Sequence, residues 1–576
     1  MTRRGWLAGA AAVVLSGLVY TNAIHNPFVY DDNRVILQNR SIVPPVNLRA
    51  ILMHDASRPV VNASYTLDRA LYGPAPEGFH VTSILLHMSV VGLLFWVAWR
   101  VMEDWRRSLG AEAAIAAHPQ LVAFAAAALF GVHPMLTEAV GYVSGRSEIL
   151  CAVFFLAAFL CARRWLLGGS WRWRAVAIAL WFVALASKET AAMFPFVVLI
   201  YDRVVRQNNG SEWRRAWRGL HLPLFVIATV LVAARLYLFV FGEHGGGLTF
   251  LPPFLLVEVD VTLRYLALML LPNGQSVFHA IPLFGLMTLR AWLSLISLGA
   301  LVAFTWWIRR RRGVASFGFA WFLLMFLPPA MLVAMDRGEP MAEHRVYLAA
   351  CGLMLAAGAT IGRMAARFGS VHPLATLILR VALVMAIVSF GARTVIRNIV
   401  WSQPVALWAE AVGKSPAHWY PRLLLGESLH NDGQHADAVA QFRIAMQLRP
   451  NEPALYTKVG TCLTELGRLD EAANAFARLQ TLVPGSVEAS NGLAAVALIG
   501  GRPDEARRRY RASLDLDPDN IQARRGLVVL EETIGNNPAE ALRLCEEIAR
   551  IAPGTSGNDD CINRNRARLG GGSAAR

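Results

Sequence analysis

The chain has 576 residues, of which 55% are hydrophobic and only 16% are charged, and its mean hydropathy is +0.41. This composition is too apolar for an ordinary soluble protein and predicts many membrane spans. A net charge of +15 would suit a nucleic-acid-binding protein. Here the arginines gather beside apolar segments, as the positive-inside bias of membrane proteins requires, so we expect no nucleic-acid partner.

Apolar stretches of roughly 20 residues, the length that crosses a bilayer, recur along residues 1–400. We expect about eleven spans, near residues 6–24, 80–100, 119–133, 148–166, 172–187, 190–206, 220–242, 287–308, 314–334, 346–362 and 373–393. The first is interpreted as an uncleaved span rather than a signal peptide, because its apolar run is long. Residues 251–272 carry Glu258, Asp260 and Arg264 at their centre, which are costly in lipid, so we expect a helix lying on the membrane surface.

The arginines predict which face of the membrane is cytoplasmic. With eleven spans, all the clusters fall on one face: residues 3–4, 106–107, 163–174, 203–218, 309–312 and 363–367. That face is cytoplasmic by the positive-inside bias. The N-terminus is then cytoplasmic, while residues 25–79 and everything after about residue 395 lie outside. Since the Ala- and Arg-rich usage is typical of a bacterium, we expect the inner membrane.

The last part of the chain repeats with a period of 34 residues. The stretches "GQHADAVAQFRIAMQLRP", "GRLDEAANAFARLQTLVP" and "GRPDEARRRYRASLDLDP" align, with Gly at a helix–helix turn, Ala at the close packing position and Pro ending each unit. This pattern is typical of tetratricopeptide repeats (TPRs). We expect four repeats over residues 417–553, stacked into a solenoid with a concave groove, and a flexible tail over 554–576.

The predicted fold class is therefore all-α: a polytopic membrane domain over residues 1–400 followed by the repeat domain. The six cysteines show no CxxC or other metal-ligand spacing. Three of them, Cys462, Cys545 and Cys561, follow the last span. An odd number there argues against a full disulfide framework.

Polar residues collect at the predicted outer face. "NPFVYDDNRVI" carries Asp31 and Asp32 at the start of the loop over residues 25–79. Other groups on this face are Arg58, His80, His133, Glu138, Arg146, Glu148, Lys188, Glu189, Glu343 and Arg345. Structural interpretations stay open. Asp31 and Asp32 could be a solvated loop start, and the histidines could be helix-end or interhelix hydrogen-bond groups. Arg146–Glu148, Lys188–Glu189 and Glu343–Arg345 could be ion pairs.

The ordered motifs carry a resemblance to a known family. "FVYDDNRVI", "RPVVNASYTLDRALYG", "VHPMLTEAVGYVSGRSEIL", "ASKETAAMFPFVVLIYD" and "AEHRVYLA" precede the TPRs in this order. Together they resemble the transmembrane-and-TPR O-mannosyltransferases and their bacterial relatives, within the GT-C class of glycosyltransferases. The resemblance covers most of the chain. It implies a GT-C-like fold, an acidic catalytic pair in the first outer loop, a polyprenyl-phosphate-linked sugar donor and a protein hydroxyl acceptor.

Transfer from a polyprenyl phosphate to a Ser or Thr hydroxyl needs a base and a cationic site for the leaving phosphate. Asp31 or Asp32 is the expected base. The expected phosphate ligands are Arg58, Arg146, Lys188 and Arg345, and the expected supporting residues are His80, His133, Glu138, Glu148, Glu189 and Glu343. A divalent cation could assist through Asp31, Asp32 or Glu148, although the sequence shows no closed ligand set.

Other functions fit parts of the sequence. A membrane-anchored TPR scaffold without catalysis would explain the repeats but not the charged residues on one face. A GT-C enzyme acting on a lipid or polysaccharide would share the same donor chemistry. A transporter is disfavoured, because transporters place charges near the bilayer midplane and here they lie at one boundary.

Overall fold

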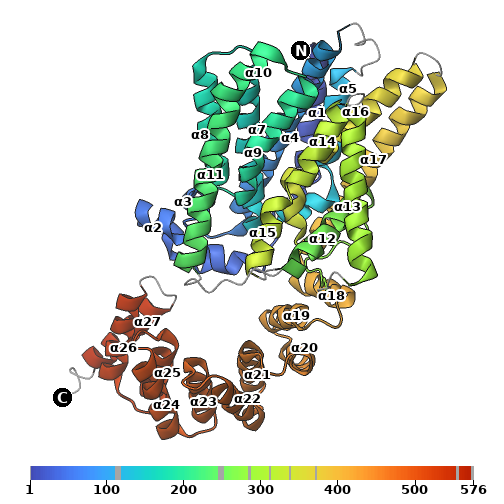
Figure 1. The fold of residues 1–576 in the computed structure, drawn as a ribbon. Coiled ribbons are helices and arrows are strands. Elements are labelled where there is room, and N and C mark those ends of the chain that lie inside the picture. The colour runs from blue at the N-terminus through green and yellow to red at the C-terminus, as the bar shows by residue number, and fades with distance from the viewer. Residues whose placement is uncertain are drawn as a thin grey trace. The chain divides into compact units, whose positions relative to one another are not determined.

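The computed structural model describes residues 2–110, 118–243, 252–282, 287–309, 313–336, 339–369, 373–552 and 557–571. Within these ranges every regular element is a helix, which confirms the all-α fold class. The chain divides into two compact units, residues 1–407 and 408–576 (Figure 1). Residues 310–312 of the predicted arginine cluster and Pro553, at the end of the predicted repeats, lie outside the described residues.

The first unit is a membrane protein built from long apolar helices. Eight helical segments in the described residues are long and apolar enough to cross a membrane: Arg3–Ala23, Pro76–Leu109, Val143–Leu166, Gly210–Phe241, Leu289–Ile308, Gly313–Ala334, Glu343–Phe368 and Pro373–Trp401. The helices Pro119–Gly131 and Pro134–Gly141 are apolar enough together to form a ninth span, but they are bent by 55° at the break, as in a broken span or a re-entrant loop.

The remaining two predicted spans are helical but short. Residues 172–187 correspond to α8 (Trp171–Leu185), and residues 190–206 to the short helices η7 (Glu189–Met193), α9 (Phe194–Ile200) and η8 (Tyr201–Val205). The surface helix expected at 251–272 is α12 (Pro252–Leu270), which is absent from the spans found among the described residues. The count of eleven stays a prediction.

Small residues allow two membrane helices to approach closely. In α14 (Gly313–Leu324), a Cβ added at Gly318 would lie 2.4 Å from the carbonyl oxygen of Gly352 in α16 (Tyr347–Gly369). A Cβ at Gly352 would lie 2.7 Å from the carbonyl oxygen of Gly318. Helices in a membrane associate largely through such close packing, since lipid supplies little hydrophobic driving force.

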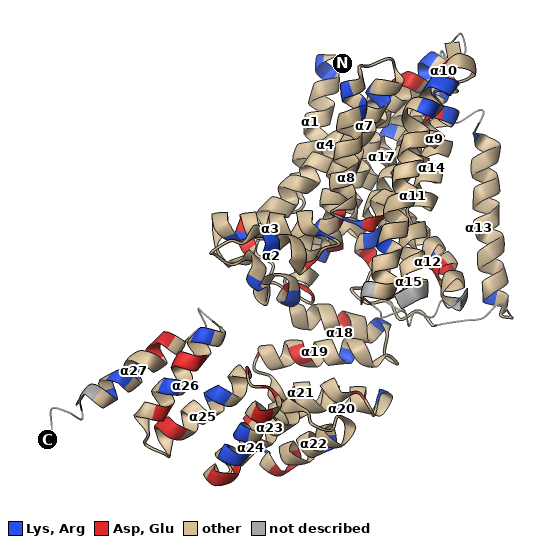
Figure 2. Cartoon of the chain, turned by 60° about the vertical axis from the view of Figure 1, so that its left-hand side comes forward, with Lys and Arg blue, Asp and Glu red and all other residues tan. Residues whose placement is uncertain are grey.

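The two ends of the helical bundle differ in charge. Lys and Arg gather at the end that holds the N-terminus and α10 (Gly210–Ala216) (Figure 2). At the opposite end lie α2 (Leu48–His54) and α3 (Pro59–Tyr72) (Figure 1).

The chain just after α1 (Arg3–Leu18) contacts the last part of α17 (Pro373–Trp401). The Asn22 side chain donates to the Val395 carbonyl (2.9 Å), and Asn398 donates to Asn22 (3.1 Å).

The second unit contains four consecutive helix pairs. They are α19/α20 (Trp419–Asn431, His435–Leu448), α21/α22 (Pro453–Glu465, Leu469–Leu482), α23/α24 (Val487–Ile499, Pro503–Leu516) and α25/α26 (Ile521–Thr533, Pro538–Ile551). Helix α18 (Pro404–Lys414) precedes them. Residues 554–576, expected to be a flexible tail, contain helix α27 (Asn558–Gly571). A disulfide between Cys545 and Cys561 joins it to α26, so two of the three C-terminal cysteines are paired.

We expect Gly318→Ala to destabilise the membrane unit by about 1–3 kcal/mol, because its methyl group would collide with backbone rather than with a flexible side chain. Thermal unfolding of the purified protein in detergent measures the effect. The matched control is Gly299→Ala in α13 (Leu289–Ile308), where nothing lies within 4 Å of the added Cβ. Equal unfolding temperatures for the two variants would contradict the close packing of α14 and α16.

Candidate active site

The membrane unit contains a cavity of about 530 Å³ at the end formed by α2 and α3. Six chain segments contribute to it, within residues 31–39, 54–65 and 142–147 and at residues 188, 235 and 344. It is lined by Asp31, Arg34, Val35, Asn39, His54, Asp55, Ala56, Ser57, Arg58, Val61, Asn62, Tyr65, Tyr142, Ser144, Ser147, Lys188, Arg235 and His344. Among the predicted site residues, the cavity therefore brings together Asp31, Arg58 and Lys188.

The two adjacent aspartates have different environments. Asp31 lines the cavity and is partly exposed. Asp32 is fully buried: its Oδ1 accepts hydrogen bonds from the backbone N–H (2.8 Å) and hydroxyl (2.6 Å) of Ser144, and its Oδ2 accepts one from the Val29 N–H (3.2 Å). Asp32 is thus not near water, contrary to a solvated loop start, and only Asp31 can meet a molecule in the cavity.

The loop before the aspartates is held by aromatic stacking. Tyr30 has φ +53°, a left-handed conformation that is uncommon for a non-glycine residue. Its ring stacks on Tyr142, which in turn stacks on Trp401. The Tyr142 hydroxyl accepts a hydrogen bond from the Asp31 N–H (3.1 Å). Such a backbone persists where its surroundings hold it, and here the surroundings orient the acidic pair.

Burial governs the proton affinity of Asp32. Removal from water raises the pKa of Asp32 to about 7, although the hydrogen bonds from Ser144 and Val29 act in the opposite direction. A carboxyl that titrates near neutral pH is characteristic of functional sites. Because Asp32 contacts Ser144 and the Val29 backbone rather than the cavity, its direct effect is on the loop that carries Asp31.

Two cations at the cavity are paired with acids. Lys188 bonds Glu148 (2.8 Å), and Arg58 bonds Glu189 (3.4 Å). The pairs Arg146–Glu148 and Lys188–Glu189, considered from sequence proximity, are therefore not the ion pairs of the structure. Burial alone would raise the pKa of Glu189, but Arg58 and then Lys188 lower it to about 2.

Both cations keep donors for a ligand. The Arg58 side chain lines the cavity and is 38% exposed, and its ion pair with Glu189 uses one guanidinium nitrogen, Nη2. The Lys188 ammonium carries three N–H donors, of which the ion pair with Glu148 uses one. An anion such as a phosphate could therefore bind to both groups without displacing the two acids.

Arg146, predicted to bind the donor phosphate, lies elsewhere. Its side chain is fully buried and does not line the cavity. The guanidinium forms an ion pair with Asp68 (2.5 Å), donates to the Phe79 carbonyl (2.6 Å) and the Ser83 hydroxyl (3.2 Å), and stacks over Tyr65. These contacts join α7 (Arg146–Leu166) to α3 and α4 (Pro76–Leu109).

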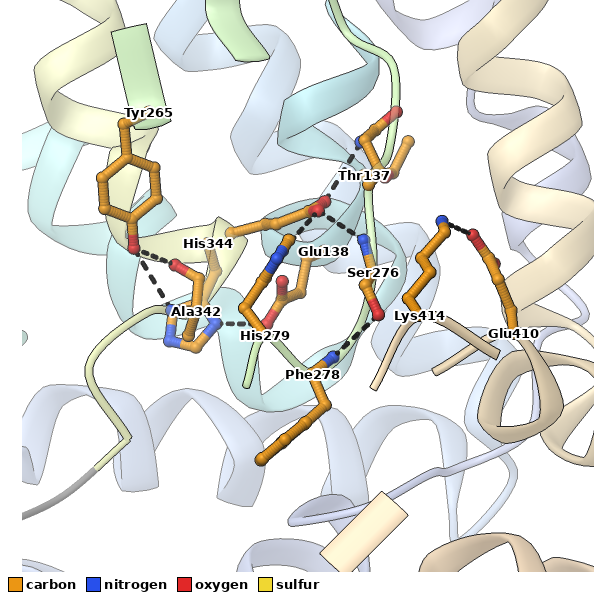
Figure 3. A network of polar contacts seen from close by, with 12 residues as sticks. Thr137, Glu138, Tyr265, Ser276, Phe278, His279, Ala342, His344, Glu410 and Lys414 are labelled. Atoms are coloured by element: carbon orange, nitrogen blue, oxygen red, sulfur yellow. Dashed lines mark hydrogen bonds and ion pairs between the residues drawn. The ribbon is translucent and has the colours of Figure 1, made fainter. Parts of the chain in front are cut away.

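Arg345 also directs its guanidinium toward protein, donating to the backbone carbonyls of Glu339 (2.7 Å) and Pro340 (3.4 Å). Its neighbour His344 lines the cavity and bonds Glu138 (2.7 Å) (Figure 3). Glu343 does not pair with Arg345 in this arrangement: its carboxylate accepts from the Ser276 N–H (2.6 Å) and contacts His279 (3.1 Å).

The two predicted histidines, His80 and His133, make structural hydrogen bonds, in agreement with the structural interpretation given above. His80 bonds the Asn26 carbonyl (3.0 Å) and His133 the Met269 carbonyl (3.0 Å), and both are buried. His133 also accepts from the Met135 N–H at the break of the bent helix pair. Neither lines the cavity.

Sequence reasoning missed two arginines of the cavity, Arg34 and Arg235. Arg34 follows the aspartates by one helical turn and makes no side-chain hydrogen bond or ion pair with another described residue. Its spacing from Asp31 could have indicated it. Arg235 lies inside a predicted span. The sequence there does not distinguish an arginine that lines a cavity from an arginine at a helix end.

The structure gives little support for a divalent-cation site at this cavity. Within the described ranges, no three His, Cys, Asp or Glu ligand atoms converge there. Of the three residues considered from sequence, Asp32 is bonded by Ser144, Glu148 by Lys188, and only Asp31 faces the cavity.

Comparison with known proteins confirms the resemblance found in the motifs. The chain is 25% identical to protein O-mannosyl-transferase Tmtc3 of Drosophila melanogaster over 88% of its own length, and 32% identical to Tmtc1 of the same species over 32% of its length. It spans 63% of the first relative and 21% of the second. These relatives and the human TMTC3, which is 24% identical over 88% of the chain, are all named protein O-mannosyl-transferases.

A tetratricopeptide-repeat family model matches residues 460–521 and 497–555, which confirms the repeats. Among solved structures, that of MamA matches 26% of the chain and 85% of its own, at 19% identity with a TM-score of 0.23.

We expect Arg146→Lys to destabilise the protein by about 3–5 kcal/mol, because one ammonium cannot replace the contacts to Asp68, Phe79 and Ser83 and a buried charge loses part of its pairing. Thermal unfolding in detergent measures this. Arg69→Lys, on the same helix as Asp68, is the control and should change the unfolding temperature little. An unchanged unfolding temperature for Arg146→Lys would restore Arg146 as a candidate ligand.

The raised pKa of Asp32 predicts a pH dependence of stability. Between about pH 4 and pH 7 the folded protein keeps a proton that the unfolded chain releases, so stability falls as pH rises through this window. Asn cannot titrate. The stability of the wild type relative to Asp32→Asn should therefore decrease between pH 5 and pH 8, by roughly 3 kcal/mol. Unfolding temperatures of both proteins at the two pH values test this; a constant difference would mean that Asp32 is ionised throughout.

Proposed function

We propose that the protein is a membrane glycosyltransferase that moves a sugar from a polyprenyl-phosphate donor to Ser or Thr hydroxyls of exported proteins. The observation that supports this best is the cavity itself, whose lining combines a free carboxylate, Asp31, with two cations, Arg58 and Lys188. The relatives' name, protein O-mannosyl-transferase, makes mannose the first sugar to test.

Asp31 acts as the general base. It takes the proton of the acceptor hydroxyl while the hydroxyl oxygen bonds the anomeric carbon of the sugar, and the bond from that carbon to the phosphate oxygen breaks. The products are the glycosylated hydroxyl, a protonated Asp31 and a polyprenyl phosphate. Asp32 is a positioning residue in this scheme, since its carboxylate bonds Ser144 and Val29 rather than facing the cavity. General-base action contributes about 10²–10⁴-fold in rate.

Arg58 and Lys188 bind the donor phosphate and stabilise the charge that grows on it as the sugar leaves. Arg34 is the third candidate, because it lines the same cavity beside the acidic pair. Glu189 and Glu148 hold Arg58 and Lys188 in place before the donor arrives. Arg146 and Arg345 support the surrounding chain instead, given their bonds to Asp68 and to backbone carbonyls.

The proposed location is the bacterial inner membrane, with the N-terminus in the cytoplasm and both the cavity and the TPR domain outside. The gathering of Lys and Arg at the end of the bundle opposite α2 and α3 supports this orientation (Figures 1 and 2). So do the hydrogen bonds between Asn22 and the last part of α17, because they put the start of the 25–79 loop and the end of the last span at one face. The TPR groove would hold the acceptor protein or a partner.

We expect Asp31→Asn to reduce sugar transfer by about 10²–10⁴-fold while donor binding stays within a few-fold, because Asn cannot accept the hydroxyl proton. Transfer to acceptor protein in reconstituted vesicles measures it. Asp55→Asn is the matched control, since Asp55 also lines the cavity but its carboxylate is bonded by Ser57. Arg58→Gln and Lys188→Gln should instead weaken donor binding at least about tenfold. Normal transfer by Asp31→Asn would exclude Asp31 as the general base, and an absence of transfer by the wild-type protein would favour a non-catalytic scaffold.

A further inference from the structure

Four potential metal ligands meet in the TPR unit, away from the cavity. They are His430 and His435, on either side of the turn between α19 and α20, and Cys462 and Glu465, one turn apart at the end of α21. One ligand atom from each lies within 4.8 Å of all the others. Cys462 is buried, His430 and His435 are partly exposed and Glu465 is exposed, so an ion can reach the cluster.

The contacts among these groups exceed what hydrogen bonds can satisfy. The Nδ1 atom of His430 lies 3.1 Å from Glu465 Oε2, 3.2 Å from His435 Nδ1 and 3.4 Å from Cys462 Sγ. His435 Nδ1 lies 3.1 Å from the same Glu465 oxygen. A ring nitrogen has one in-plane direction for its proton or lone pair and can make one good hydrogen bond, yet three partners converge on His430.

A tetrahedral metal ion accounts for all of these distances together. Zinc binds histidine nitrogen and carboxylate oxygen at about 2.0–2.2 Å and thiolate at about 2.3 Å. The edges of such a tetrahedron are about 3.3 Å between nitrogen or oxygen ligands and about 3.6 Å between nitrogen and sulfur. The four short contacts, 3.1 to 3.4 Å, lie close to these edges.

We propose that His430, His435, Cys462 and Glu465 form a zinc site that joins the first TPR to the second. Two imidazoles, one thiolate and one carboxylate are a donor set that suits Zn²⁺. Four protein ligands leave no open position, as in structural zinc sites. The ion would fix the α19–α20 turn against α21 and so stiffen one edge of the repeat stack.

Comparison among the repeats of this chain supports a dedicated site. One period further on, the positions of His430 and His435 hold Thr464 and Leu469, and those of Cys462 and Glu465 hold Val496 and Ile499. None of these can bind zinc except weakly through Thr464. The TPR fold therefore does not require His, Cys or Glu at these places, and their meeting at one repeat boundary needs another explanation.

Cobalt binding to the full-length, tag-free protein in detergent tests the site. After chelator treatment and without added reductant, titration with Co²⁺ should give one equivalent with the visible bands of a tetrahedral ion and a thiolate-to-metal charge-transfer band, and Zn²⁺ should abolish both. Cys462→Ser should lose the charge-transfer band, and His435→Gln and Glu465→Gln should each weaken binding by more than about 100-fold, since even changes outside the ligand shell cost 10–100-fold.

The matched control is His418→Gln, another TPR-unit histidine, whose ring caps α19 by accepting from the Tyr420 N–H. It should keep wild-type metal binding. Glu465 is exposed, so its variant tests the site even if the Cys462 variant fails to fold. Absence of tetrahedral bands in the wild type, or binding that survives both His435→Gln and Glu465→Gln, would overturn the proposal.

Discussion

The buried ion pair between Arg146 and Asp68 is the interaction on which the rest of the membrane unit's site depends. Arg146 begins α7, Asp68 belongs to α3, and the same guanidinium bonds the Phe79 carbonyl and Ser83 of α4. Breaking a buried pair leaves an uncompensated charge, which is strongly destabilising. The pair therefore fixes α3 against the helical bundle. This positions both sides of the cavity. Arg58 directly precedes α3, and Ser144, which holds Asp32, lies two residues before Arg146.

The acids of the cavity act mainly by orienting other groups. Glu148 and Glu189 hold Lys188 and Arg58, while Asp32 is held by Ser144 and shapes the loop around Asp31. An enzyme gains most when its charged groups are oriented before the substrate arrives, because the reaction then requires little reorganisation. Such an arrangement leaves two kinds of group available to a substrate. One is the carboxylate that faces the cavity, and the other is the pair of cations with unused donors. The proposed transfer reaction uses both.

The two units have different sources of stability. In the membrane unit, close glycine contacts such as Gly318–Gly352 and buried ion pairs join the helices. In the TPR unit each repeat packs on its neighbour, so the stack depends on the boundary between repeats. The disulfide Cys545–Cys561 joins the last repeat to α27, and the proposed zinc site would reinforce the first boundary between repeats. Both ends of the repeat stack would then carry a covalent or coordinate link.

The sequence by itself determined the helical class, the membrane character and the repeats, because hydropathy and a 34-residue period are local properties of the chain. It also indicated the acidic pair and the cations Arg58 and Lys188 through the ordered motifs. Only the tertiary structure decided the pairing of charges. Arg146 bonds Asp68 rather than Glu148, Lys188 bonds Glu148 rather than Glu189, and Asp31 faces the cavity while Asp32 does not. The same holds for His430, His435, Cys462 and Glu465, which no metal-ligand spacing connects. Adjacent residues compete for partners in space, and which partner wins depends on helix packing that sequence proximity does not encode.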